Sequence, residues 1–497
     1  MLGVVDVVVI GGGVAGCAAA LAAARRGAEV ALFTKLPDPE EANTRYAQGG
    51  IVYTGPDDSP GLLVEDVVGS GAGSRAAAEL LSREGPPLVR ELLIEDLQVP
   101  FDRDADGFEG LHLTLEAAHS APRILHHRDT TGREIQRALT RAVRDEERVT
   151  LLPGTEALEL VVSGGRCAGV HAARDGEVLT LLGRGVVLAT GGLGALYEHT
   201  TNPPAATGDG FALALGAGAR LRDLHYVQFH PTALYSPSGE RFLVSEAVRG
   251  EGGVLEDPDG EEFVDHPLGS LAPRDVVARE TWSMMEQTGS PCAYLNITHR
   301  PEGWLEERFP AIHARCSSEG IDMARQPILV VPAAHYTCGG VETDLCGRTS
   351  LRGLWAAGEV ASTGLHGSNR LASTSLLEGL VFGWRAGESA AHSPAPVPDR
   401  RPSNPPVSIP EGAPEEAWRR LRRVVWNAAG LVRTADGLGE GLAEIEGLEK
   451  EYRGTALDGA LIVARTLLEG ALSDGRSRGC HYRLDAREEV AFADLPG

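Results

Sequence analysis

The sequence predicts an α/β fold in which the first domain is interrupted by an insertion and followed by a helical domain. Three observations support this prediction. The N-terminus passes from a β-branched run through a glycine-rich turn into an alanine-rich stretch, which is typical of a strand, a turn and a helix. The mix of residues changes near residue 225 and returns to buried strands near residue 330. A proline-rich segment then precedes a last stretch with helical periodicity.

These changes divide the chain into four expected parts. An α/β domain would combine residues 1–224 and 330–392, with an inserted α+β capping domain at 225–329. The proline-rich linker is expected at 393–411 and the C-terminal helical domain at 412–497. A chain of 497 residues is longer than one hydrophobic core usually serves, so more than one domain is expected.

The N-terminal unit predicts a dinucleotide site. Residues 4–10 are expected to form a strand buried on both faces, 17–25 a helix, and 29–33 a second parallel strand. The turn between strand and helix has the spacing G-x-G-x-x-G, formed by Gly11, Gly13 and Gly16. Glycines at such a turn let the backbone approach a pyrophosphate at the helix N-terminus, so the domain is expected to be Rossmann-like.

One residue of this pattern is missing. The second strand of such a unit usually ends in an acidic residue that binds a ribose hydroxyl, but Thr34 and Lys35 stand there. The sequence therefore leaves open how a ribose would be held.

A second glycine-rich segment, residues 353–378, belongs to the same prediction. Residues 354–357 are expected to form a short buried strand, and Ser373 is placed to cap the helix that follows. A helix N-terminus can face an anionic ligand, and Arg370 in the loop can bind a carboxylate through two parallel hydrogen bonds. By itself, the loop could equally be an ordinary one with a surface arginine.

The remaining elements follow from local patterns. Residues 75–125 are expected to be helical with loops, and Pro414 suits the first turn of its helix. The residues at 477–483 are basic and are expected to fold back on the body of the protein. Further strands are expected at 150–152, 158–162, 185–189 and 330–334, and further helices at 211–217, 414–428 and 438–471.

Charge and cysteine usage exclude several classes of function. The chain has 46 basic and 70 acidic residues, a formal charge of −24, which argues against a nucleic-acid or anionic-membrane surface. The seven cysteines are scattered and contain no C-x-x-C, so we expect a reducing, cytoplasmic compartment and no metal site. The uncharged run at 7–24 is interrupted by three glycines, so we interpret it as buried and not as a membrane span.

Six further motifs occur in a fixed order along the chain. They are Y-A-Q-G-G at 46–50, Q-F-H-P-T at 228–232, A-P-R-D at 272–275, H-Y-T-C-G-G at 335–340, H-G-S-N-R-L at 366–371 and G-L-V-R-T at 430–434. In this order they resemble the flavoprotein family of succinate dehydrogenase and fumarate reductase, over nearly the whole chain. Within that family the chain is most similar to the members that oxidise L-aspartate.

The resemblance implies FAD in the Rossmann-like domain. In respiratory members a histidine of the 43–50 loop is bonded to the flavin, whereas Asn43 or Thr44 stands at that place here, so the FAD is expected to be non-covalent. His366 is expected to line the flavin. The implied FAD contacts are Gly11, Gly13, Val14, Ala15, Gly16, Lys35, Asn43, Thr44, Ala47, Gln48, Gly49, Gly50, Asp209, Glu359, Ser375 and Leu376.

The resemblance also implies a substrate site. Arg274 would donate or accept the proton, and Glu116 would orient the amino group of aspartate, where dicarboxylate dehydrogenases tend to have a neutral glutamine. Glu246 and Arg249 would relay protons to Arg274, although their i,i+3 spacing also suits a simple surface pair. The implied dicarboxylate-binding residues are Gln228, His230, Ser245, His335 and Arg370, with serine at 245 where the family more often has threonine.

The activity implied is oxidation of L-aspartate to iminoaspartate, the first step of NAD synthesis from aspartate. O2 would be reduced to hydrogen peroxide, or fumarate to succinate, and quinolinate synthase would use the product. One alternative is a soluble fumarate reductase or succinate dehydrogenase flavoprotein, disfavoured by Glu116 and by the missing flavin-linking histidine. A tRNA-modifying flavoprotein is disfavoured by the negative charge, and a non-enzymatic FAD-binding module has no use for the arginines and histidines.

Overall fold

The computed structural model of the chain describes residues 2–236, 241–395 and 407–486. Its centre is a five-stranded parallel sheet in the order β19-β11-β2-β3-β7. All five strands are rich in β-branched or aliphatic residues, because helices or other sheets cover both faces. The strands are β2 (Val7–Ile10), β3 (Val30–Thr34), β7 (Val149–Pro153), β11 (Gly185–Leu188) and β19 (Leu354–Ala356).

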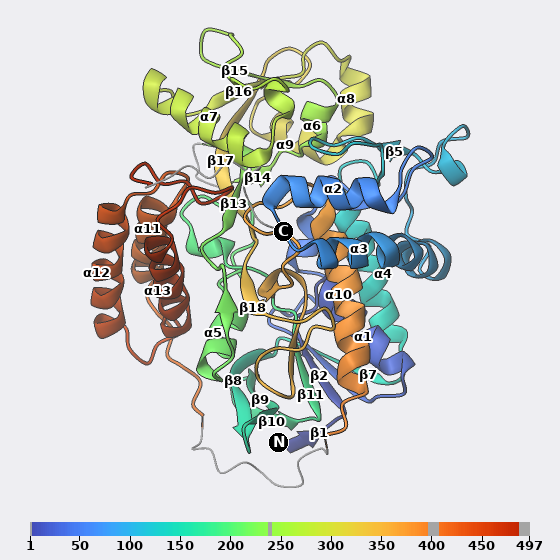
Figure 1. Cartoon of the computed structure of the whole chain (residues 1–497), viewed down its shortest axis with the longest axis vertical. Helices are drawn as coiled ribbons and strands as arrows, with labels where there is room; N and C mark the ends of the chain where they lie inside the picture. Colours follow the sequence, from blue (N-terminus) through green and yellow to red (C-terminus); the bar gives the residue numbers. More distant parts are fainter. Residues whose placement is uncertain (1, 237–240, 396–406, 487–497) are drawn as a thin grey trace.

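Two helices lie side by side against this sheet (Figure 1). They are α1 (Val14–Arg25) and α10 (Thr374–Ala391). Three glycines spaced four apart on α10 make the close approach possible. A Cβ at Gly383 would lie 2.4 Å from the carbonyl oxygen of Ala15, and one at Gly387 would lie 2.1 Å from that of Ala19. The alanine-rich sequence of α1 therefore reflects backbone-to-backbone packing, which fixes the position of its N-terminus.

Several predicted boundaries were wrong. The strand predicted at 4–10 is two strands, because β1 (Leu2–Val4) pairs with a different sheet and β2 begins at Val7. The stretch 75–125 is helical only as far as Asp96, through α3 (Arg75–Leu88) and a π-helical turn (Val89–Asp96). Pro86 and Pro87, which lack backbone N–H groups, lie just before that widened turn. The remainder contributes two short strands, β5 (Leu113–Thr114) and β6 (Ile124–Leu125), and β6 pairs with both β5 and β4 (Ile51–Val52).

Two smaller sheets and further helices complete the first domain. A four-stranded sheet has the order β1-β10-β9-β8, and a three-stranded sheet has the order β12-β18-β20. Their strands are β8 (Glu156–Ser163), β9 (Arg166–Arg174), β10 (Glu177–Leu182), β12 (Leu221–Arg222), β18 (Gly340–Glu342) and β20 (Ala361–Ser362). The helices are α2 (Pro60–Gly71), α4 (Thr131–Asp145) and α5 (Asp209–Gly216), with short 3-10 turns at Asn43–Tyr46, Phe108–Gly110, Gly194–Leu196 and Gly358–Val360.

The inserted segment has a core of its own. Its five-stranded sheet has the order β14-β13-β17-β16-β15, and it stands at the top of Figure 1. The strand predicted at 330–334 is much longer, because β17 continues from the insertion back into the first domain. The strands are β13 (Val227–Leu234), β14 (Phe242–Leu243), β15 (Val254–Glu256), β16 (Ala293–Asn296) and β17 (Ile328–Thr337). The helices are α6 (Ala247–Gly250), α7 (Arg274–Thr288), α8 (Glu302–Arg308) and α9 (Pro310–Ser318), with a 3-10 turn at Gly269–Leu271.

The C-terminal helices lie at the left of Figure 1 and share a core with one face of the parallel sheet. They are α11 (Glu415–Ala429), α12 (Ala435–Glu451) and α13 (Asp458–Ser473). The helix predicted at 438–471 is therefore two helices, and Gly454 with its positive φ of 82° lies in the turn between them. Pro414 is the residue before α11 and not part of its first turn. Residues 396–406 of the predicted linker and 487–497 of the predicted helical domain lie outside the described residues.

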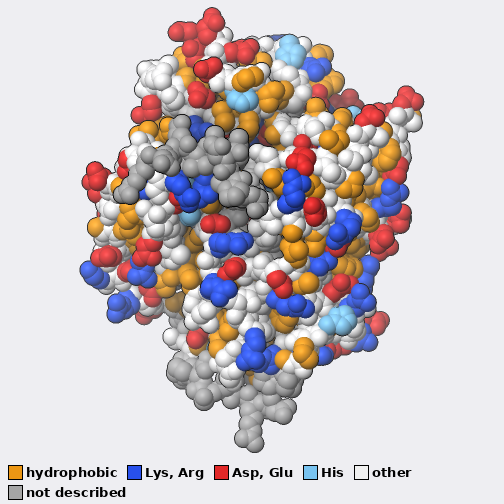
Figure 2. All heavy atoms as spheres, in the orientation of Figure 1, with side chains coloured by type: hydrophobic (Ala, Val, Ile, Leu, Met, Phe, Trp, Pro, Cys, Tyr) orange, Lys and Arg blue, Asp and Glu red, His pale blue; other side chains and the backbone are white. Residues whose placement is uncertain are grey.

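Charged side chains of both signs stand on the visible surface. In the view of Figure 2, basic and acidic side chains alternate and do not gather into a patch of one sign. Among the described residues, no helix combines the length and the apolar character needed to cross a bilayer.

Candidate active site

A single large cavity contains most of the predicted site residues. Its empty volume is about 1790 Å³, including space open to solvent. It runs from the glycine turn at Gly11 to Arg274 and Arg370, so one continuous space connects the residues predicted for the cofactor with those predicted for the substrate. Glycines and the N-terminus of α1 line one part of the wall, and buried charged side chains from the inserted segment line another.

The G-x-G-x-x-G turn has the geometry that its spacing predicts. Gly11 has a φ of 112°, and a Cβ there would lie 2.1 Å from the carbonyl oxygen of Ala189. A Cβ at Gly16 would lie 1.8 Å from the carbonyl oxygen of Gly11. Gly16 is not among the residues that line the cavity. It allows α1 to pack closely on β2 and so acts on the cofactor site only indirectly.

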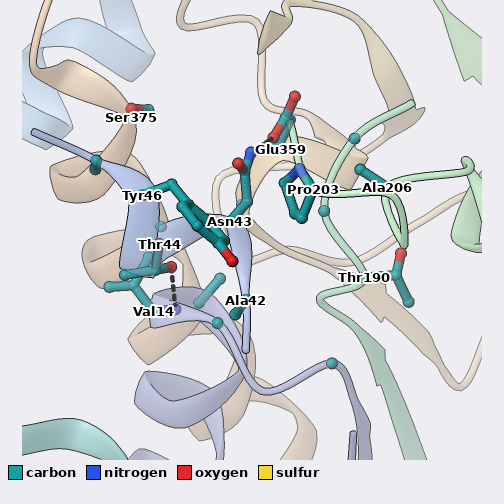
Figure 3. A pocket seen from close by; sticks show the side chains of 18 of the residues that line it. Val14, Ala42, Asn43, Thr44, Tyr46, Thr190, Pro203, Ala206, Glu359 and Ser375 are labelled. Carbon is teal, nitrogen blue, oxygen red and sulfur yellow. Dashed lines mark hydrogen bonds between the residues drawn. The ribbon is translucent and has the colours of Figure 1, made fainter. Parts of the chain in front are cut away.

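The 43–50 loop forms the opposite side of the cofactor region (Figure 3). The Oγ1 atom of Thr44 accepts a hydrogen bond of 3.0 Å from the backbone N–H of Val14, which satisfies one free donor at the start of α1. Asn43 points at Glu359, and its Nδ2 donates to Glu359 Oε2 at 3.2 Å. Burial raises the pKa of Glu359 to about 7, against the lowering effect of the hydrogen bonds from Thr337 N and Asn43. Of the two residues expected at the flavin-linking place, Asn43 is thus an amide engaged with a carboxylate, and Thr44 is a hydroxyl engaged with the start of α1.

The acidic residue that usually ends the second strand is missing from β3, but Glu156 of β8 lies near the end of that strand. Lys35 Nζ lies 2.8 Å from Asp209 Oδ2 and 3.0 Å from Glu156 Oε1, and all three residues line the cavity. Glu156 and its neighbour Thr155 were not predicted, because no local motif marks them. Their position follows from the pairing of β3 with β7, which brings the turn after β7 to the same edge of the sheet.

The wall contains buried polar atoms that suit a bound cofactor. Gln48 Oε1, Thr155 Oγ1 and Thr190 Oγ1 have no hydrogen-bond partner within the described residues, and all three residues line the cavity. Buried polar groups are nearly always paired, so these atoms fit a ligand that carries hydrogen-bonding groups. Together with the glycine turn and its helix N-terminus, they fit a dinucleotide such as FAD.

Arg274 is the centre of a buried charged group beside this region. Its Nε donates to Glu246 Oε2, and its Nη1 donates to Gln228 Oε1 at 3.2 Å. Arg249 Nη2 lies 3.5 Å from Glu246 Oε2. Glu246 and Arg249 are both almost fully buried, so the surface-pair interpretation is wrong. Burial opposes the ionisation of Glu246, but Arg274 and Arg249 outweigh it and lower the pKa of that carboxyl.

Gln228 and Arg249 do not line the cavity; the structure places them behind its wall. Gln228 Nε2 donates to Asn369 Oδ1 at 2.7 Å and to the backbone oxygen of Arg370 at 2.8 Å. Since its Oε1 accepts from Arg274, Gln228 holds both cavity arginines in place. The predicted role of Gln228 as a substrate-binding residue is therefore wrong, because its side chain does not reach the cavity.

Two histidines and Arg370 bring donors to the same end of the cavity. The ring centroids of His230 and His335 lie 5.0 Å apart, and burial together with nearby arginines lowers the pKa of both well below its usual value. Both rings are therefore neutral near pH 7. His230 Nδ1 accepts from the backbone N–H of Thr232, which leaves its Nε2–H as a donor. Ser245 is buried beside them, and its Oγ accepts from Ala247 N at 3.2 Å.

Arg370 is nearly fully buried and remains a cation. Burial, together with Arg274, lowers its pKa to about 10, which is still far above neutral pH. Its guanidinium lies 4.7 Å from the ring centroid of Tyr336, and its Nη1 donates to Ser375 Oγ at 3.1 Å. Its Nε has no partner within the described residues, so it has hydrogen-bonding capacity left for a ligand.

Glu116 lines the cavity as a buried carboxyl. Burial, with a further contribution from Glu246, raises its pKa. Ser373 Oγ donates to Glu116 Oε2 at 2.6 Å. Ser373 was predicted as a helix cap; it does precede α10, but its side chain makes no capping bond and instead binds Glu116. The sequence offered no signal for this pair, which is separated by 257 positions.

His366 does not line the cavity as expected. Its Nε2 lies 2.7 Å from Glu378 Oε2, and Tyr336 donates from its hydroxyl to the same oxygen at 2.8 Å. The histidine is therefore part of a buried support behind the ring of Tyr336. All other predicted site residues apart from Gly16, Gln228 and Arg249 line the cavity.

Comparisons with known proteins identify the family of the chain. The family model for the FAD binding domain matches residues 6–376. L-aspartate oxidase 1 of Ralstonia nicotianae is 42% identical, covering 97% of this chain and 95% of its own length. L-aspartate oxidase of Halobacterium salinarum is also 42% identical, covering 99% of this chain and 98% of its own.

Solved structures show the same fold. A quinol fumarate reductase of E. coli superposes with a TM-score of 0.90 at 28% identity, covering 99% of this chain and 94% of that one. The Sdh1 structure of Mycobacterium smegmatis superposes with a TM-score of 0.83 at 32% identity, covering 99% and 90%. The family match, the relatives and the fold all point the same way. The chain belongs to the L-aspartate oxidases, within the FAD-binding flavoproteins related to succinate dehydrogenase and fumarate reductase.

Proposed function

We propose that this protein oxidises L-aspartate to iminoaspartate with FAD as its cofactor. The observation that carries the proposal is Glu116, a buried carboxyl in the same cavity as Arg274, Arg370, His230 and His335. A substrate with two carboxylates and one amine needs cationic or neutral donors for the first and an acceptor for the second. When bound, FAD takes up the two electrons of the oxidation and passes them to O2 or to fumarate.

The chain's own residues divide into binding and proton-handling groups. Arg370, His230 and His335, with Ser245, bind the carboxylates in a pocket that excludes water, where each charged hydrogen bond is stronger than in solution. Glu116 accepts a hydrogen bond from the amine and orients the Cα–H bond. Its raised pKa makes it a better proton acceptor than an ordinary carboxylate at the pH where it is ionised.

Arg274 is the proposed proton donor when fumarate is the oxidant. A guanidinium hardly gives up a proton in water, but here Arg274 donates directly to Glu246, and Glu246 in turn lies beside Arg249. A proton that leaves Arg274 for the substrate carbon can therefore be replaced through Glu246. This buried series of contacts, from Arg274 to Glu246 to Arg249, supports the relay role proposed for Glu246 and Arg249.

The experiment that tests the function is an anaerobic spectrum of the purified protein before and after adding L-aspartate, with succinate and D-aspartate as controls. We expect L-aspartate alone to bleach the flavin band. Bleaching by succinate but not by L-aspartate would move the chain to the dicarboxylate dehydrogenases. Absence of a flavin band even after adding FAD would contradict the cofactor assignment.

Replacing Glu116 by glutamine tests the assignment of the amine site. The Glu116→Gln variant keeps the size of the side chain but loses its charge, so we expect kcat/KM for L-aspartate to fall on the order of 10²-fold, as for a lost charged hydrogen bond. Binding of succinate should change by less than about threefold, because succinate has no amine to contact residue 116. An equal loss for both ligands would contradict the assignment.

The mode of FAD attachment is tested by acid precipitation. Asn43 is an amide engaged with Glu359, and neither it nor Thr44 has the imidazole with which a histidine forms a bond to flavin. We expect all yellow colour in the supernatant after precipitation with trichloroacetic acid. Colour retained in the washed pellet would show a covalent link and would disprove the expectation.

Two finer points belong to the same proposal. The product is an imine that water hydrolyses, and we propose quinolinate synthase as the enzyme that consumes it. We also propose a cytoplasmic location, supported by the seven cysteines, which all fall within the described residues and are free thiols. Oxygen consumption coupled to quinolinate formation when the two purified enzymes are mixed would test the first point.

A further inference from the structure

A fully buried arginine lies next to the loop that carries Glu116, and it takes no part in the chemistry proposed above. Arg123 donates from Nε and Nη2 to the two carboxylate oxygens of Asp58, at 2.9 and 2.7 Å, and from Nη1 to Asp66. Asp66 also accepts from the backbone N–H and the hydroxyl of Ser120, each at 2.9 Å. A buried guanidinium with this many hydrogen-bond partners is held in one orientation, so the side chain of Arg123 is fixed within the loop.

Arg123 determines the tautomer of His119. Its Nη1 lies 3.3 Å from His119 Nδ1, and because a guanidinium can only donate, Nδ1 must be the accepting nitrogen. The proton of the neutral ring therefore lies on Nε2, which donates to the backbone oxygen of Ala372 at 3.0 Å. Burial, with a further contribution from the charge of Arg123, lowers the pKa of His119 to about 4, so the ring is neutral near pH 7.

The bond to Ala372 closes a ring of contacts around Glu116. The next residue, Ser373, has a φ of 55° and donates from its hydroxyl to Glu116 Oε2 at 2.6 Å. The backbone N–H of His119 donates to the backbone oxygen of Glu116 at 3.2 Å. On the other side, a Cβ at Gly49 would lie 2.5 Å from Glu116 Oε1, so glycine there leaves room for the carboxylate. The backbone oxygen of Glu116 is therefore held by His119 and its carboxylate by Ser373, and the His119 ring connects these two residues through Ala372.

We propose that His119, oriented by Arg123, is a positioning residue that sets the preference for an amino dicarboxylate over one without an amine. It holds the backbone at Ala372 so that the Ser373 hydroxyl keeps Glu116 aimed into the cavity. The inference rests on the proposed function, since it assigns the amine of the substrate to Glu116. His119 does not line the cavity, so it acts on a ligand only through Glu116. Its effect is therefore confined to ligands that carry an amine for Glu116 to contact.

The test compares His119→Leu, which removes both ring nitrogens, with His119→Gln, which keeps an N–H donor toward Ala372. For each we measure KM and kcat for L-aspartate and the Kd of succinate from the change it causes in the flavin spectrum. We expect His119→Leu to raise the KM for L-aspartate about tenfold, and the Kd of succinate to stay within about twofold. For His119→Gln, the KM for L-aspartate should lie much closer to the wild-type value. An unchanged KM, or equal weakening of both ligands, would overturn the inference.

Two further variants keep the test decisive. Ser373→Ala removes the final hydrogen bond directly and should reproduce the KM effect, which decides the question if His119→Leu loses its FAD. In a Glu116→Gln background, His119→Leu should add less than about twofold, since residues that act through one another are not additive. Full additivity would count against the proposal.

The control variant is His171→Leu. This histidine bonds Thr180 on the strand pair β9–β10 and does not line the cavity. It should leave both constants unchanged. The wild-type protein separates the two hypotheses: if L-aspartate does not bleach its flavin, the proposed function and this inference both fail. If wild type is bleached and His119→Leu behaves like wild type, only the inference fails.

Discussion

Replacing Arg274 by methionine is expected to lower turnover more than any other single change, by about 10²- to 10⁴-fold, the contribution typical of a positioned acid or base. Arg274 lines the cavity and donates to both Glu246 and Gln228, so the variant removes the proposed donor and leaves Glu246 with Arg249 as its remaining cation. The loss should appear in kcat for fumarate reduction, measured with a reduced dye as the electron source. Binding of succinate should weaken much less than kcat falls.

The matched control is Arg279→Met on the same helix, α7. Arg279 pairs with Asp275 at 3.0 Å and does not line the cavity, so we expect its turnover to stay within about threefold of wild type. Flavin content and melting temperature are measured for both variants. An Arg274→Met protein that retains its FAD and loses less than tenfold in kcat would refute the proton-donor role.

Replacing Arg370 by methionine is expected to weaken substrate binding by about 10²- to 10³-fold, since hydrogen bonds to a charged group contribute about 1.5–3 kcal/mol each. Arg370 is a buried cation whose Nε is unpaired within the described residues, and it lies over the ring of Tyr336. A methionine at 370 can pack on that ring but cannot bind a carboxylate. The KM for L-aspartate should rise, and the Kd of succinate should rise by a similar factor.

Weaker binding of both ligands distinguishes Arg370 from Glu116, because replacing Glu116 should leave the Kd of succinate nearly unchanged. Arg385→Met is the control, because Arg385 lies on the helix that follows Arg370 and pairs with Glu84 at 2.8 Å outside the cavity. A variant at 370 with an unchanged Kd for succinate would show that the other donors alone bind the carboxylates. FAD content must be equal in the proteins compared.

The sequence by itself determined the Rossmann-like unit and most of the cavity wall. The turn at Gly11 requires glycine for a local reason, its positive φ, and therefore leaves a local pattern. Motifs such as Q-F-H-P-T and H-G-S-N-R-L placed His230 and Arg370 in the site through their resemblance to the flavoprotein family. Element boundaries were less reliable: β1 and β2 read as one strand because hydrophobicity does not reveal that they pair in different sheets.

Only the tertiary structure decided which of these residues reach the cavity and what holds them there. Gln228 belongs to the same motif as His230, yet it lies behind the wall, as Arg249 does, and the two support Arg274 and Glu246. Glu156 lies beside Lys35 because β3 pairs with β7, and Ser373 meets Glu116 across most of the chain. A motif records the residue types that a local backbone or ligand requires, whereas contacts between distant segments depend on packing, which no short stretch of sequence specifies.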